Sequence, residues 1–128
     1  MEDIIKEHFG DLKLIDLMYS DEERDEARLV LMTSGYIDGS KEIQTALVDK
    51  MEGYLSHIQS EEFKKDYPQK NVIIEVIFNE MPSNVTFANL YGCYGWCESW
   101  GAKLCVSLEK QPLTITRDEN GDYHIHLD

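Results

Sequence analysis

The sequence predicts an α+β fold in which two helices pack on one face of a mostly antiparallel sheet. Apolar residues recur at every third or fourth position in Ser40–Tyr67 and again in Ser83–Trp100, which is the periodicity of helices with one buried face. Short stretches rich in β-branched residues, bounded by turn-forming residues, surround both helices and are typical of strands. The expected order is ββαβαβββ, in a single domain that spans residues 1–128.

The first two strands are expected to form a hairpin. Residues Met1–Gly10 are compatible with either a short helix or a frayed terminus. Strands are predicted at Leu12–Tyr19 and Ala27–Thr33. The acidic segment Asp21–Glu26 lies between them, and its charged side chains would be costly to bury, so we expect a solvated turn there.

The helix that begins after Ser40 is expected to be the main core element, with Ser40 as its N-cap. Fully burying an apolar side chain contributes about 1.5–3 kcal/mol, far more than a surface ion pair. Tyr67 is expected to end the helix, because a residue before proline avoids the α region. The predicted buried face consists of Ile43, Leu47, Met51, Tyr54, Leu55 and Ile58, and the solvent face of Lys41, Gln44, Thr45, Asp49, Lys50, Glu52 and Gln59.

The strongest strand candidate is Asn71–Glu80, which is rich in β-branched residues and apolar on both faces except at Glu75. A strand that is apolar on both faces is expected at the centre of the sheet. The second helix is predicted to start after Ser83 and to end at Gly101, which has the residue type preferred at the C′ position. A strand at Lys103–Glu109 follows.

The C-terminal segment is predicted to form a bulged hairpin, and its register follows from the apolar residues. A two-residue loop would pair Ile115 with His126, whereas the three-residue loop Glu119–Gly121 pairs Ile115 with Ile125. Only the second register gathers the apolar side chains on one face of the hairpin. It also puts Gly121 at the left-handed position that such a loop requires.

The composition limits the classes of partner. The formal net charge of −13 disfavours nucleic acid and anionic lipid and favours a cationic partner. The three cysteines are an odd number, and the N-terminal sequence MEDIIKEHFG has no basic region followed by an apolar run. These features indicate a cytoplasmic location with free thiols. No stretch is apolar over the length that a transmembrane helix needs, so we expect no association with a membrane.

The chain contains, between Leu14 and Leu108, the segments IDLMYSD, ARLVLMTS, LVDKMEGYLSHIQSEEF, YP, NVIIEVIF and WGAKL. It thereby resembles a family of small bacterial domains of unknown function, whose members have a strand pair, a helix of the type LxEKINxYLxFIESGE, a YP pair, a VVIEV strand and an amphipathic helix. The resemblance implies a shared core but brings no catalytic residues. The sequence departs from the family pattern in the Gly-, Tyr-, Trp- and Cys-rich second helix and in the C-terminal hairpin. Any special function is expected at these two places.

Two pairs of residues have side chains that can bind metal ions. Cys93 and Cys97 are four residues apart in the second helix, and His124 and His126 share one face of the last strand. The cysteine spacing is not CxxC, and buried cysteines usually pack as small apolar side chains. We expect structural thiols and solvated histidines, with metal binding as the open alternative for both pairs. No metal or cofactor is predicted.

Glu75 is the one charged residue inside the strongest strand. A half-buried carboxylate between Ile73 and Ile77 can have a raised pKa and act as a general acid. It can also pair with a Lys or Arg of a neighbouring strand, which is our expectation. The chain has no nucleophile elbow, phosphate-binding glycine loop or HExxH motif, so no catalytic residue is predicted. A small hydrolase or isomerase that uses Glu75 with a histidine is the alternative function.

The second helix carries four aromatic residues, Tyr91, Tyr94, Trp96 and Trp100, spread around its circumference, so they cannot all face the sheet. Exposed Tyr and Trp side chains are common anchors of protein interfaces. Together with the negative net charge, these aromatic residues predict a non-enzymatic binding protein. One form of such a protein is an inhibitor or immunity-type protein that binds a cationic protein. A homodimer paired through an edge strand at Tyr123–Leu127 and a monomer both remain open.

Overall fold

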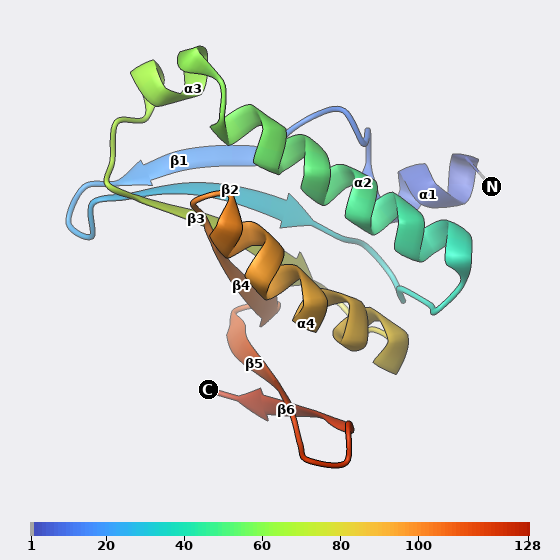
Figure 1. The fold of residues 1–128 in the computed structure, drawn as a ribbon. Coiled ribbons are helices and arrows are strands. Elements are labelled where there is room, and N and C mark those ends of the chain that lie inside the picture. Colours follow the sequence, from blue (N-terminus) through green and yellow to red (C-terminus); the bar gives the residue numbers. More distant parts are fainter. Residues whose placement is uncertain (1) are drawn as a thin grey trace.

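The computed structural model describes residues 2–128. Its strands form one six-stranded sheet in the order β1-β2-β3-β4-β5-β6, and the long helices α2 and α4 lie on the same side of it (Figure 1). The α+β class is confirmed, with four helices rather than the expected two. The elements are α1 (Glu2–Phe9), β1 (Leu17–Asp21), β2 (Glu26–Met32), α2 (Lys41–Ile58), α3 (Glu61–Asp66), β3 (Asn71–Phe78), α4 (Asn84–Ser99), β4 (Lys103–Leu108), β5 (Gln111–Arg117) and β6 (Tyr123–Leu127).

The centre of the sheet is parallel. β3 pairs in parallel with both β2 and β4, whereas the β1–β2, β4–β5 and β5–β6 pairs are antiparallel. The expectation of a mostly antiparallel sheet is therefore wrong at its centre. The reason is that helices connect β2 to β3 and β3 to β4. A helix that crosses the sheet returns the chain to the edge where the previous strand began, so the next strand runs in the same direction.

The segment predicted as one helix, Ser40–Tyr67, forms two. The Ser40 hydroxyl caps α2 as expected, by accepting a hydrogen bond from the Ile43 N–H. α2 ends at Ile58, and the Ser60 hydroxyl then accepts a hydrogen bond from the Phe63 N–H at 3.1 Å, which starts α3. A serine that bonds to nearby backbone groups in this way competes with continuation of the helix.

The core lies between α2, α4 and the alternate strand residues that face them. All six residues of the predicted buried face of α2 are buried, which confirms its rotation on the apolar side. As expected, β3 lies inside the sheet, between β2 and β4. The strand residues of this core include Leu29, Leu31, Ile74, Val76, Phe78, Leu104, Val106, Leu113 and Ile115.

Two residues predicted on the solvent face of α2 are buried instead. Lys50 is fully buried, and its ammonium group donates hydrogen bonds to the Phe9 carbonyl and, at 2.6 Å, to the Asp16 carboxylate. Asp16 in turn accepts a hydrogen bond from the Met32 N–H at 2.9 Å. This network fixes the loop that precedes β1, so the strand starts at Leu17 rather than at the expected Leu12.

Gln44 is the second such residue. Its side-chain amide donates to the Asp38 carbonyl at 2.7 Å and to the Thr86 hydroxyl at 2.8 Å, and its carbonyl accepts from the Asn89 amide at 3.0 Å. The three bonds tie the start of α2 to the start of α4. A buried polar side chain is stable when it is fully hydrogen-bonded, and only the tertiary contacts supply these partners.

The C-terminal hairpin has the predicted register. Ile115 pairs with Ile125, and Gly121 adopts the left-handed conformation with φ of +88°. The hairpin lies at one end of the sheet, where both of its strands contact α4, and β6 forms the edge (Figure 1). None of the helices within residues 2–128 is long and apolar enough to cross a membrane.

Candidate functional site

The four aromatic residues of α4 do not form one cluster. Tyr91 and Trp100 are exposed, at 37% and 39%, whereas Tyr94 and Trp96 are half-buried against the core. The Tyr91 ring packs edge-on against Tyr94 and, at a centroid distance of 5.5 Å, against Tyr123 of β6. Trp100 lies at the other end of the helix, as its C-cap. Within residues 2–128, Tyr91 is therefore the one of these four residues whose ring packs against an aromatic ring of the edge strand β6.

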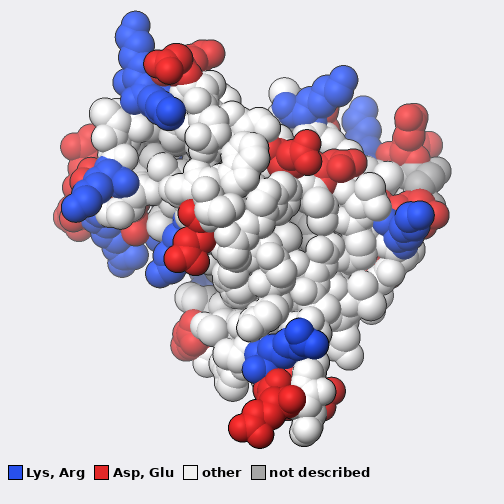
Figure 2. Space-filling model, viewed as in Figure 1, with Lys and Arg blue, Asp and Glu red and all other residues white. Residues whose placement is uncertain are grey.

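The solvent side of α4 lacks charged residues before Glu98, which is unusual for this chain. No charged residue occurs between Glu80 and Glu98, although charged residues make up 29% of the sequence. Figure 2 shows the consequence, a broad expanse without charged groups over α4, with both acidic and basic groups at its margins. This expanse, here called the α4 surface, is formed by the exposed or half-buried residues Val85, Ala88, Tyr91, Gly92, Gly95 and Trp96. The long gap in the charge pattern is the sequence signal that predicts it, and the aromatic residues alone do not.

Glycines form the middle of the α4 surface. Apart from the adjoining residues and the backbone of α4 itself, a Cβ atom added at Gly92 or Gly95 would meet no atom of residues 2–128 within 4 Å, so no packing neighbour among these residues requires a glycine there. Neither residue is among the glycines with positive φ. Because the two glycines have no side chains, the helix presents a flat stretch between Tyr91 on one flank and Trp96 on the other.

The two cysteines of α4 lie on its buried side. Burial raises the pKa of the Cys93 thiol to about 11 and that of the Cys97 thiol to about 12. The Cys97 sulfur lies 3.9 Å from the Met51 sulfur in the core. Both thiols are therefore protonated at neutral pH and occupy the positions of small apolar side chains.

The histidines of β6 bond within the hairpin. His124 lies 2.6 Å from the Asp118 carboxylate, and His126 lies 3.0 Å from the Thr116 hydroxyl. The bond to His124 is the main reason why the pKa of Asp118 is lowered. In the part of the chain that the structure describes, no three His, Cys, Asp or Glu side chains come close enough to hold a metal ion.

Glu75 pairs with an arginine of the neighbouring strand, which confirms the expected ion pair. Its carboxylate lies 3.0 Å from the Arg28 guanidinium, which also contacts Glu26 at 3.1 Å. The Ser107 hydroxyl donates a further hydrogen bond to Glu75 at 3.4 Å. No histidine bonds to Glu75 within residues 2–128, so the enzymatic alternative gains no support from the geometry.

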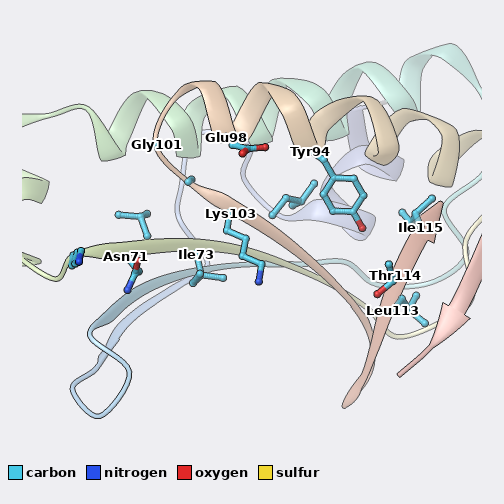
Figure 3. A pocket seen from close by; sticks show the side chains of 13 residues that line it. Asn71, Ile73, Tyr94, Glu98, Gly101, Lys103, Leu113, Thr114 and Ile115 are labelled. Atoms are coloured by element: carbon cyan, nitrogen blue, oxygen red, sulfur yellow. The ribbon is translucent and has the colours of Figure 1, made fainter. Parts of the chain in front are cut away.

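A cavity lies where β4 and β5 separate. It has a volume of about 710 Å³ and is here called the β4–β5 cleft. Figure 3 shows Tyr94 projecting from α4 toward Thr114 and Ile115 on β5, with Lys103 on the other strand. Burial raises the pKa of the Tyr94 phenol, in agreement with its position inside the cleft. The lining residues are Lys70, Asn71, Val72, Ile73, Tyr94, Glu98, Gly101, Ala102, Lys103, Leu104, Leu113, Thr114 and Ile115.

Comparison with known proteins gives one match. The model of a family of unknown function, DUF6572, covers residues 9–110. The chain belongs to this family. The resemblance stated above, to a family of small domains of unknown function, is thereby confirmed. Neither the curated proteins nor the solved structures include one that matches the chain.

The DUF6572 match covers the helices from α2 onward and the strands β1 to β4, and it ends at Lys110. The hairpin of β5 and β6 lies outside it. Both features described above involve this hairpin, because Tyr91 contacts β6 and the cleft lies between β4 and β5.

Proposed function

We propose that this member of the DUF6572 family is a non-enzymatic binding protein that docks on another protein through the α4 surface. The observation that carries the proposal is the absence of charge from one exposed helix face in a chain with a net charge of −13. The centre of a protein interface is depleted of charged residues and enriched in aromatic ones. Tyr91 and Trp96 flank the flat centre of this surface, where they can serve as anchors.

The glycines support the same proposal. A glycine inside a helix costs about 1 kcal/mol relative to alanine. Gly92 and Gly95 incur this cost although nothing within the chain fills the space of a side chain there. A helix face without side chains lets the backbone of a partner approach closely. Contact with a partner would therefore explain why glycines occupy these two positions.

The partner that fits best has an apolar centre and a basic rim. The net charge of −13 attracts a cationic protein, most strongly at low ionic strength, and the uncharged centre avoids burying unpaired carboxylates. An inhibitor or immunity-type protein of the cytoplasm, which neutralises a cationic protein, is the form of this function that we favour.

The test is a mixing experiment with the proteins encoded next to this chain, at micromolar concentration and in low and physiological salt. A complex is expected to be tighter at low salt. The variant Gly92→Glu puts a charge at the centre of the α4 surface and should abolish the complex. Thr45→Glu, which adds the same charge at an exposed position of α2, should leave it intact. Absence of any complex, or equal effects of the two variants, contradicts the proposal.

A second copy of the chain is a further partner that we propose, at a different surface. β6 is an edge of the sheet, and its strand Tyr123–Leu127 contains no lysine or proline to protect it. Antiparallel pairing of two β6 strands around a two-fold axis would satisfy its free backbone groups. Light scattering at tens of micromolar protein, in low and physiological salt, distinguishes the homodimer from the monomer. The mass of a monomer in both conditions contradicts the dimer.

A further inference from the structure

We propose that the β4–β5 cleft binds an extended peptide segment, which adds a strand along the free edge of β4 and presents an acidic side chain to Lys70 and Lys103. This site is separate from the α4 surface, and it does not depend on the proposed function. Three features support it: an unfinished strand ladder, an apolar floor and two lysines at the rim.

The ladder between β4 and β5 is short. It joins Val106 to Leu113, Ser107 to Pro112 and Leu108 to Gln111, and it stops there although both strands continue. Pro112 has no N–H, so the pair that it forms with Ser107 is the one without hydrogen bonds. The backbone groups of Val106 therefore point toward β5, and by alternation so do those of Leu104.

Leu104 is the residue left without a strand partner on this side. It is only 4% exposed, and the β4–β5 ladder provides no hydrogen-bond partner for its N–H and C=O groups. Buried backbone groups in native proteins are almost always paired. An extended peptide in the cleft would complete the ladder at this point, which is how peptides bind to exposed strand edges.

The cleft has the size and lining of a binding site. Its volume of about 710 Å³ falls within the range of about 300–1,000 Å³ that is usual for ligand sites. Leu104, Leu113 and Ile115 are buried residues that provide an apolar floor, and the Tyr94 ring faces the same space. Because side chains of a strand alternate between two faces, one apolar side chain of the peptide would enter this floor.

The rim explains the preference for an acidic peptide. Lys70 and Lys103 are both exposed, and within residues 2–128 neither forms an ion pair. Glu98 lines the cleft from α4, so the local charge of the lining residues is positive although the chain is acidic overall. Repulsion by the more distant carboxylates is screened beyond about 8 Å at physiological salt.

The experiment is an NMR titration of the ¹⁵N-labelled protein with two hexapeptides. One is acetyl-Thr-Glu-Val-Glu-Val-Thr-amide, and the other has Lys in place of both Glu residues. The acidic peptide should shift the amide signals of Leu104, Thr114 and Ile115 in a saturable way, and it should slow hydrogen exchange at Leu104. The basic peptide should bind at least about threefold more weakly, since it lacks the contacts with the rim lysines.

Two variants separate a strand site from general charge effects. Lys103→Glu should lower the affinity for the acidic peptide about three- to tenfold, because it reverses one charge at the rim of the cleft. Lys65→Glu makes the same change at an exposed position of α3 outside the cleft and should have no effect. The proposal is overturned if the acidic peptide at millimolar concentration shifts the amide signal of no cleft residue. It is also overturned if both variants weaken the binding of this peptide equally, or if free glutamate produces the same shifts. An amide of Leu104 that exchanges as slowly as that of Val106 in the free protein would also overturn it.

Discussion

Replacement of Gly92 and Gly95 by alanine should stabilise the protein while it weakens the proposed interface. Each change removes a cost of about 1 kcal/mol for glycine in a helix interior, and among residues 2–128 the new methyl groups meet no atom within 4 Å beyond the adjoining residues and the backbone of α4. The double variant should therefore gain about 2 kcal/mol of unfolding free energy, which raises the Tm by roughly 5–10 °C. Urea unfolding followed by far-UV circular dichroism measures the gain.

The matched control is Gly101→Ala at the end of the same helix. Gly101 has φ of +88°, so a side chain there strains the backbone, and the variant should lose about 1–2 kcal/mol. If the double variant is unchanged or destabilised, the two glycines have a role in folding, and the inference from their empty surroundings is refuted. If it is stabilised and still binds a partner with full affinity, the α4 surface is not the interface.

Three further predictions concern the buried network, the thiols and the hairpin. Lys50→Met should destabilise by about 1–3 kcal/mol, because the Phe9 carbonyl and the partly exposed Asp16 carboxylate lose their bonds to the buried ammonium group, whereas Lys65→Met should stay within about 0.5 kcal/mol. Equal denaturation midpoints for these two variants would show that the ion pair contributes nothing. In the native protein an alkylating agent should modify the half-buried Cys105 first, since the two thiols of α4 have pKa values of about 11 and 12. Equal rates at all three thiols would contradict this. The pKa of Asp118 is lowered in the folded state, so its stabilising effect is present above the unfolded pKa of about 4 and is lost as the pH falls through the folded value. Carboxyl titration by NMR should show this pKa rise in His124→Ala, and an unchanged value would exclude the histidine as the cause.

The sequence by itself determined the features that depend on neighbouring residues. Ser40, Ser83 and Gly101 mark helix ends as predicted, because capping needs only the residue itself and the next turn of backbone. The register of the last hairpin also follows locally, since a single slip would move every apolar side chain to the other face. The central position of β3 and the pairing of Glu75 with a basic residue of a neighbouring strand were predicted from a strand that is apolar on both faces and contains one charge, whereas the sheet decided that this residue is Arg28.

The tertiary structure alone decided what depends on distant partners. Lys50 has the sequence context of a solvent-facing residue, and its burial depends on the Phe9 carbonyl and the Asp16 carboxylate, which come from segments far away in the chain. The sequence predicted that some of the four aromatic residues of the second helix are exposed, but which of them face solvent and which line the β4–β5 cleft depends on where β5 and β6 lie. The cleft itself results from two strands that pair at their shared turn and then separate. Each strand has an ordinary sequence pattern, and the Tyr94 side chain of α4, which lines the space between the two strands, comes close to them only in the folded chain.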